Sequence, residues 1–320
     1  MSITARVVGA FAVALIAALV ATPVARRIAL ARGIVCNPTR RGVHRDPVPY
    51  LGGLAILVSV VLGGLFCPFS PKLLGVGLAA VIITAVGAAD DIADLRAWRK
   101  LLLSVAAATI LVPFGVVVEG IAVPGHGFVG FDVFAVTATI VWVVGLVHAS
   151  NLMDGMDGEA AGLTAIAASA FLVLGLMWLR VDSPVAPHED LALVAVMSAA
   201  VVGACLGFLR HNFHPARIFM GDAGSQLLGL LLAALAIIGL FKTVLLCVVP
   251  VIVLGLQIAD TVWAIVRRKL AGRPAFAPDR GHVHHRLLDM GFSQRGAVLM
   301  LYAIAVGLAV LAIHLGSPMP

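Results

Sequence analysis

The amino-acid sequence predicts an all-α membrane protein: a polytopic bundle of about ten transmembrane helices in one domain that covers residues 1–320. The 320 residues are 61% hydrophobic and only 12% charged, and their mean hydropathy of +1.09 is far above that of soluble domains. No segment alternates polar and apolar residues with the period of two that a membrane β-barrel requires. Helices, which satisfy their own backbone hydrogen bonds in lipid, are therefore expected.

Ten apolar runs have roughly the 17–25 residues that a helix needs to cross a bilayer. They lie near Val7–Val24, Leu51–Phe69, Leu73–Ala89, Leu101–Val118, Phe131–Ala149, Ala160–Leu179, Leu191–Leu209, Ala223–Phe241, Thr243–Val266 and Ala297–Leu315. Each run predicts one transmembrane helix.

The distribution of Lys and Arg orients these helices. Loops after the odd-numbered runs (25–50, 90–100, 149–158, 209–222 and 267–296) carry 18 of the 22 basic residues. Basic loops face the cytoplasm, so we expect both termini on the outer side of the membrane. On that outer side, Val123–Gly127 within the loop before the fifth run predicts a turn or a short hairpin.

The first cytoplasmic loop combines basic residues with turn-forming ones. Arg40, Arg41 and His44 precede Pro47 and Pro49, and the prolines favour an ordered turn over a helix. Two interpretations stay open: a basic anchor on the cytoplasmic side, or a site at which the Arg and His side chains face an anionic ligand.

Two adjacent carboxylates, Asp90 and Asp91, end the third run. Neighbouring carboxylates repel each other unless a cation lies between or beside them. One interpretation is therefore a divalent metal ion. The other is a solvated helix terminus with Arg96 and Arg99 as partners.

The stretch Asn151–Gly158 places an amide, two carboxylates and two glycines between long apolar runs. Carboxylates at the hydrocarbon boundary are costly, so Asp154 and Asp157 are functional candidates. Among the five cytoplasmic loops this one carries no Lys or Arg. It therefore supplies the acidic part of any site that the loops share.

A third carboxylate, Asp222, lies between Gly221 and Gly224 at the start of the eighth run. The glycines would let backbone amides approach a ligand while Asp222 is exposed to it. Ser225 is expected to cap the helix that follows.

The last cytoplasmic loop holds three histidines, His282, His284 and His285, between Arg280 and Arg286. Zinc is one interpretation, because histidine is its common ligand. The flanking arginines favour an anion instead. Asp260, near the end of the ninth run, is a further membrane carboxylate that could pair with Arg267.

All of these polar clusters fall in loops of one side, whereas a channel or pump needs ionisable residues within several spans. Carboxylates, glycines, Arg, Lys and His together suit a phosphate-rich substrate with Mg²⁺, which takes few carboxylates plus substrate oxygens. The formal charge of +6 follows from membrane topology, and no nucleic-acid partner is expected.

Taken together, the clusters resemble the polyprenyl-phosphate N-acetylhexosamine-1-phosphate transferases, a family of integral membrane enzymes. The resemblance covers nearly the whole chain and rests on Asp90-Asp91 with Lys100, Asn151–Gly158, Phe219–Ser225 and His282–His285, with support from Gly42–His44, Pro49 and Gly52-Gly53. It implies transfer of a sugar 1-phosphate from a UDP-N-acetylhexosamine to a polyprenyl phosphate, with release of UMP. The implied cofactor is Mg²⁺, with Mn²⁺ as an alternative.

The same resemblance assigns roles residue by residue. It implies catalytic roles for Asp90, Asp91 and Asp222, with Asp222 and Asp154 as metal ligands. It implies nucleotide-sugar contacts for Asn151, Asp154, Asp157, His282, His284 and His285, and phosphate contacts for Lys100, Arg40 and His44. The sequence departs from the family pattern at Glu159, where an apolar residue is usual, and at His148 and Ser150.

The form His282-Val283-His284-His285 resembles the branch that acts on UDP-GlcNAc for surface polysaccharide or teichoic-acid linkage. The branch that makes the first lipid intermediate of peptidoglycan, from phospho-N-acetylmuramoyl-pentapeptide, has three consecutive histidines. That activity is the alternative, a secondary transporter is a third hypothesis, and a homodimer is an open option. The polyprenyl chain requires an apolar groove open to lipid, and the sequence does not identify the helices that line it.

Overall fold

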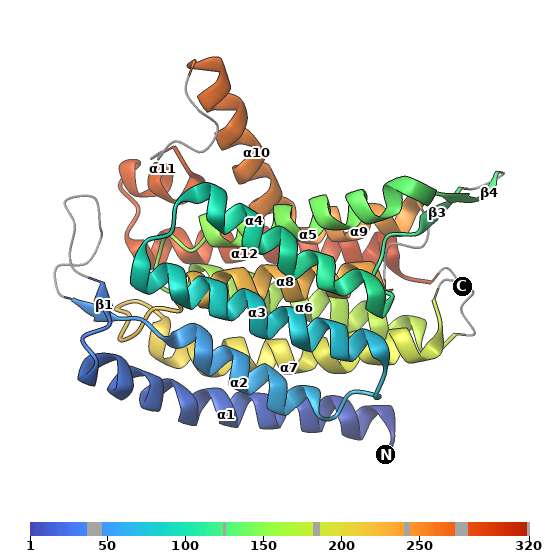
Figure 1. Ribbon diagram of the computed structural model, residues 1–320, viewed down its shortest axis with the longest axis horizontal. Coiled ribbons are helices and arrows are strands. Elements are labelled where there is room, and N and C mark those ends of the chain that lie inside the picture. The colour runs from blue at the N-terminus through green and yellow to red at the C-terminus, as the bar shows by residue number, and fades with distance from the viewer. Residues whose placement is uncertain (37–46, 124–125, 182–185, 240–243, 273–280, 319–320) are drawn as a thin grey trace.

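The computed structural model describes residues 1–36, 47–123, 126–181, 186–239, 244–272 and 281–318. These residues form a bundle of helices with two small two-stranded sheets (Figure 1). The predicted all-α fold class is confirmed.

The long helices are α1 (Ile3–Ala31), α3 (Pro71–Ala93), α4 (Ala97–Leu111), α5 (Ala135–Leu152), α6 (Glu159–Trp178), α7 (His188–Asn212), α8 (Gly221–Gly239) and α12 (Gln294–Gly316). The shorter elements are α2 (Gly52–Gly64), α9 (Val244–Val253), α10 (Gly255–Leu270), α11 (Val283–Asp289), the 3₁₀ turns η1 (Val112–Phe114) and η2 (Asp132–Phe134), and the strands β1 (Val35–Cys36), β2 (Val48–Pro49), β3 (Gly120–Val123) and β4 (Gly127–Gly130). Strands β3 and β4 are antiparallel, so the hairpin that was predicted around Val123–Gly127 is confirmed.

All ten apolar runs fall on helices, but not all make straight spans. Eight helices of the described chain are long and apolar enough to cross a membrane, and α9 with α10 makes a ninth, bent by 77°. The bend lies between Pro250 and Gly255, residues that commonly kink helices. The second run gives only the 13-residue α2, because the helix ends at Gly64 and the rest of the run, residues 65–69, is not helical. The chain before α2 is extended and bridges Tyr50 to Phe219.

Helix α8 is the centre of the bundle. Every residue from Ala223 to Gly239 is buried, and α8 packs against α2, α3, α5, α6 and α7. A helix that is apolar on all sides is expected in such a position. Outer helices such as α1 and α4 keep most of their surface for lipid.

Glycines allow α3 and α2 to lie against the first turn of α8. A Cβ on Gly87 of α3 would lie 2.4 Å from the Ala223 nitrogen, and one on Gly53 of α2 would lie 2.3 Å from the Gly224 nitrogen. Small residues permit such backbone approach in membrane bundles. The close approach brings the carboxylates that end α3 next to Asp222.

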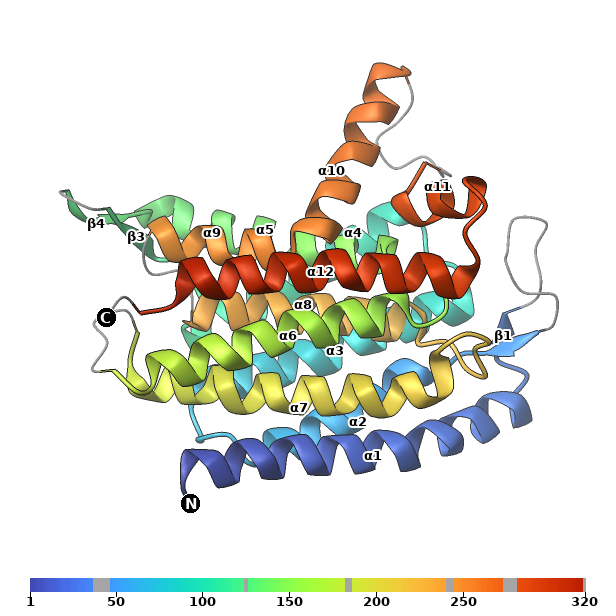
Figure 2. The ribbon, with the colours of Figure 1, turned by 180° about the vertical axis from the view of Figure 1, so that it is seen from behind.

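The polar clusters gather at one end of the bundle. The last turns of α3 and α5, the first turn of α8, and α11 lie at this end, whereas the start of α1, the end of α12 and the β3–β4 hairpin lie at the other (Figures 1 and 2). The sequence-based grouping is thus confirmed for the clusters within the described residues, and Arg40, Arg41 and His44 lie outside them. Which side of the membrane each end faces stays a prediction.

Paired substitutions on α3 test the close approach. Gly87→Ala should lower the free energy of unfolding by roughly 1–3 kcal/mol, because the added methyl overlaps the α8 backbone. Gly77→Ala, on the same helix, meets nothing within 4 Å and should be neutral or stabilising by at most about 1 kcal/mol. Thermal unfolding in detergent measures both, and equal effects at the two positions would contradict the packing.

Candidate active site at the polar end of the bundle

The side chain of Asp91 caps helix α8 from the neighbouring helix α3. Its Oδ1 accepts from the Asp222 amide at 2.8 Å and its Oδ2 from the Ala223 amide at 3.3 Å. First-turn amides have no partner within their own helix, and a carboxylate there is also favoured by the helix dipole. Gly221 has a φ of +68°, and a Cβ on it would lie 2.3 Å from Asp91 Oδ2, so glycine is required.

Ser225 was expected to cap this helix, and that expectation is wrong. Helix α8 begins at Gly221, and the Ser225 hydroxyl donates to the Gly221 carbonyl at 3.1 Å from within the helix. The cap comes from another helix, a long-range contact that no local pattern encodes.

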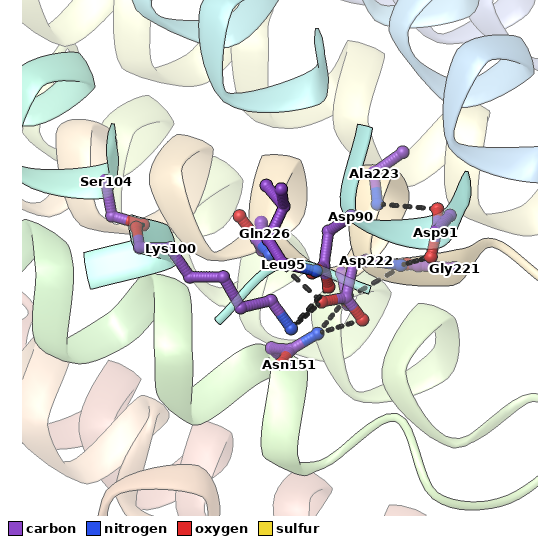
Figure 3. A network of polar contacts seen from close by, with 11 residues as sticks. Asp90, Asp91, Leu95, Lys100, Ser104, Asn151, Gly221, Asp222, Ala223 and Gln226 are labelled. Atoms are coloured by element: carbon purple, nitrogen blue, oxygen red, sulfur yellow. Dashed lines mark hydrogen bonds and ion pairs between the residues drawn. The ribbon is translucent and has the colours of Figure 1, made fainter. Parts of the chain in front are cut away.

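Asp222 receives donors from three helices (Figure 3). Asn151 Nδ2, from the last turn of α5, donates to Oδ1 at 2.8 Å. Lys100 Nζ, from α4, lies 2.7 Å from Oδ2, and Gln226 Nε2 donates to the same oxygen at 3.2 Å. These contacts hold the carboxylate in a fixed orientation, and it stays partly exposed.

Lys100 joins two of the predicted carboxylates. Its ammonium pairs with Asp90 Oδ2 as well as with Asp222. The other oxygen of Asp90 accepts from the Leu95 amide at 2.8 Å, which fixes the chain just after α3. Arg96 and Arg99, the partners considered in one of the two interpretations, are exposed. The cation beside Asp90 is Lys100 instead.

The Asn151–Gly158 loop lies between this network and the rest of the polar end. Asp154 is half-buried, and burial together with the charges of Glu159, Asp222 and Asp91 raises its pKa well above the ordinary value. After burial, the groups that act most strongly on Asp154 are thus other carboxylates.

Asp157 has a different environment from Asp154. It is buried, and its Oδ2 contacts His214 Nδ1 at 2.7 Å and accepts from the Ala216 amide at 2.9 Å. The loop is further fixed at Gly158, whose amide donates to Asn212 Oδ1 at 3.0 Å. Asp157 therefore ties the loop to the segment between α7 and α8.

The histidine cluster reaches the loop from the other side. A Cβ on Gly155 would lie 2.3 Å from His284 Nε2, so the buried ring of His284 packs directly on the loop backbone. Nδ1 of the same ring lies 3.6 Å from Glu159 Oε1. The ring of His285 is next to that of His284, with 4.4 Å between centroids.

His282 is held by Asp260. Asp260 Oδ2 contacts His282 Nδ1 at 2.6 Å, and Oδ1 accepts from the Val283 amide at 2.8 Å. Arg267, the partner considered for Asp260, donates to the Gly281 carbonyl at 2.8 Å. The polar contacts of Asp260 therefore anchor the start of α11 to α10.

The structure thus sorts the predicted residues into two groups. One group converges around Asp222: Asp90, Asp91, Lys100 and Asn151, with Asp154 in electrostatic range. The other packs around the loop and α11: Asp157, His282, His284 and His285. Arg40 and His44 lie outside the described residues.

Two residues of the site, Gln226 and His214, carried no predicted role. Gln226 lies one helical turn after Asp222, so its contact was readable once α8 was known to begin at Gly221. His214, by contrast, contacts Asp157 over 57 positions of sequence, and no local signal points to it.

The donor chemistry fits Mg²⁺. Carboxylate oxygens are its preferred protein ligands, and it is commonly bound by one or two of them together with substrate phosphates. In the described part of the chain, no three His, Cys, Asp or Glu side chains form a metal-holding group.

Comparisons with known proteins agree on the type of enzyme. The model of glycosyl transferase family 4 matches residues 73–240. The chain is 39% identical to a probable undecaprenyl-phosphate N-acetylglucosaminyl 1-phosphate transferase of Bacillus subtilis, across 98% of this chain and 86% of the relative. It is 38% identical to a decaprenyl-phosphate N-acetylglucosaminephosphotransferase of Mycolicibacterium smegmatis, across 88% and 75%.

A second group of relatives is more distant. A phospho-N-acetylmuramoyl-pentapeptide-transferase of Desulforudis audaxviator is 32% identical across 95% of both chains. The order of identities places the N-acetylglucosamine transferases nearer to this chain.

Removing the shared cation tests the network. Lys100→Met removes the positive charge between the carboxylates of Asp90 and Asp222, which then repel each other. This substitution should lower the free energy of unfolding by roughly 1–3 kcal/mol. This is less than the 3–5 kcal/mol of a fully buried pair, because the lysine keeps some solvent. Asp90→Asn in the same chain should restore part of the loss.

Thermal unfolding at pH 7 and fixed salt is the measurement. Lys269→Met, an exposed lysine of α10, is the control and should change little. If Lys100→Met is as stable as this control, the ion pairs do not hold the three helices together.

Proposed function

The chain belongs to glycosyl transferase family 4, and from that premise we propose that it transfers N-acetylglucosamine 1-phosphate from UDP-N-acetylglucosamine to a polyprenyl phosphate, releasing UMP. The observation that carries the proposal is the convergence of Asp90, Lys100, Asn151 and Asp222 from four helices on one partly exposed point. Such a site can align two phosphorylated substrates, which is the main task in phosphoryl transfer.

The charges of the site suit two anionic substrates. An oxygen of the polyprenyl phosphate attacks the phosphorus next to the sugar, the bond to the bridging oxygen breaks, and UMP leaves with that oxygen. Because the second pKa of a phosphate is near 6, the acceptor is already largely dianionic at pH 7. Lys100 orients the phosphates, and no strong base is needed, so Asp90 chiefly fixes Lys100.

Asp222 and Asp154 are the proposed ligands of Mg²⁺. The bound ion would neutralise phosphate charge between the two substrates. Asn151 keeps Asp222 in place through its 2.8 Å hydrogen bond. Asp91 does not bind the ion itself but positions Asp222, because its oxygens accept hydrogen bonds from the amides of Asp222 and Ala223.

The nucleotide sugar is proposed to lie along the Asn151–Gly158 loop and α11. The loop has two glycines that allow close approach, and His284 and His285 lie beside it. The polar end would face the cytoplasm of a bacterial inner membrane, since the loops at this end hold most of the basic residues.

Two alternatives are less well supported. Transfer to make the first peptidoglycan lipid intermediate is an activity named for relatives of lower identity. A secondary transporter would need charged groups at the middle of its spans. In the described helices, the charged side chains lie in the first two or last two turns, although Asp260 falls inside the bent span made of α9 and α10.

Asp222→Asn tests the reaction. With UDP-N-acetylglucosamine, polyprenyl phosphate and Mg²⁺, the purified chain should form the lipid-linked sugar and UMP, and Asp222→Asn should lower kcat by at least about 100-fold, as loss of an essential charged group does. Asp132→Asn, an exposed residue of the opposite end, is the matched control.

Product formation from UDP-N-acetylmuramoyl-pentapeptide alone would favour the peptidoglycan alternative. Formation of no lipid-linked product from either donor would reject the transferase proposal.

The metal requirement has its own test. A chelator should abolish turnover, and added Mg²⁺ should restore it. Asp154→Asn should raise the Mg²⁺ concentration for half-maximal rate by roughly ten-fold, with little change in the KM for polyprenyl phosphate, because one charged ligand is lost. Full turnover in excess chelator would refute a bound metal.

A further inference from the structure

One buried carboxylate, Glu159, lies outside the chemistry described so far. It is the first residue of α6 and is 0% exposed. Neither of its carboxylate oxygens has a hydrogen-bond donor. Burial of a charge without compensation is strongly unfavourable, so a group nearby must balance it.

The group that can do so is His284. Its Nδ1 lies 3.6 Å from Glu159 Oε1, and this nitrogen likewise has no hydrogen-bond partner. Both side chains are buried. A protonated imidazole opposite the carboxylate would satisfy both, and the position of Glu159 in the first turn of α6 further favours its negative charge.

The other edge of the same ring faces the proposed nucleotide-sugar loop. A Cβ on Gly155 would lie 2.3 Å from both Nε2 and Cε1 of His284. The ring is thus held between Glu159 on its Nδ1 edge and the loop backbone on its Nε2 edge. A side chain at position 155 would displace it, and only glycine leaves that edge in direct contact with the loop.

The charged groups around the ring come from several elements. Asp260 of α10 acts on it from beyond His282, with which Asp260 is hydrogen-bonded. His282, which precedes α11, and His285 of α11 flank the ring, and the buried Arg268 of α10 lies 3.4 Å from His282 Nε2. Burial acts to lower the pKa of His284, but Glu159 and Asp260 together outweigh burial and the net shift is upward.

On the Glu159 side the surroundings are neutral or acidic. Tyr302 of α12 donates its hydroxyl hydrogen to the Gly158 carbonyl at 2.5 Å, and Asp154 of the loop is close enough for its charge and that of Glu159 to oppose each other. The carboxylates of Glu159 and Asp260 are the groups that favour the cationic form of His284.

We propose that Glu159 is a positioning residue that holds His284 as a doubly protonated imidazolium, so that its Nε2–H is presented at Gly155 to the diphosphate of the nucleotide sugar. The role of the diphosphate rests on the proposed function. The charge state of the Glu159–His284 pair does not.

The charge state can be measured without substrate. In the full-length chain with ¹⁵N-labelled histidines in detergent, the His284 signals are assigned by their loss in His284→Gln. Both ring nitrogens should be protonated at pH 7 in the unsubstituted chain, and Glu159→Gln should give a neutral ring. A neutral His284 ring at pH 7 in the unsubstituted chain overturns the proposal, whatever the enzyme does.

The link to substrate is read from KM across pH. In Glu159→Gln the imidazole loses its proton at lower pH, so the KM for UDP-N-acetylglucosamine should rise roughly ten-fold at pH 8 and less than about two-fold at pH 6, as expected for loss of one charge-assisted hydrogen bond. The KM for polyprenyl phosphate should not change. A purely structural role would instead give a ratio that is constant with pH.

Two controls complete the test. Glu189→Gln changes an exposed first-turn glutamate of α7 and should match the unsubstituted chain at every pH. In a His284→Gln chain, Glu159→Gln should add nothing further, because the two residues act as one unit. If the effects of the two substitutions on KM are additive, the proposal is overturned. If the unsubstituted chain shows no turnover at all, the proposed function is overturned, and the charge-state measurement alone decides the role of Glu159.

Discussion

The contact between the Asp91 carboxylate and the first amides of α8 is the constraint on which the polar end depends. It joins the end of α3 to the start of the most buried helix of the bundle. Asp222 is the second residue of α8, so its position follows directly from this cap. The small residues that let α3 approach, Gly87 and Gly221, serve the same junction.

Asp222 in turn gathers the other helices. Lys100 brings α4 to it and Asn151 brings α5. Each of these side chains neutralises or orients a carboxylate that would otherwise be repelled by its neighbours. The site is therefore also part of what holds the helix ends together, so its substitutions are expected to affect stability as well as chemistry.

The fold class and the grouping of polar clusters could be predicted from the sequence, because apolar runs and basic loops are local signals. The predicted residues around Asp222 do meet, although nothing in their spacing gives the contacts between them. Ser225 shows the limit: it has the composition of a helix cap, but the helix begins four residues earlier because a distant carboxylate supplies the cap. Likewise the partners of Asp260 and Asp157 are histidines far away in the chain.

The balance of charge separates two kinds of carboxylate at this end. Asp91 and Asp157 accept backbone amides, and Asp260 accepts a backbone amide and contacts a buried histidine, so their charges are satisfied within the protein. Asp154 has other carboxylates as its main electrostatic neighbours and is half-buried, and Asp222 keeps partial exposure although Asn151, Gln226 and Lys100 already contact it. A metal that arrives with the substrate phosphates could therefore reach these two carboxylates, which is the physical basis on which they are proposed as its ligands.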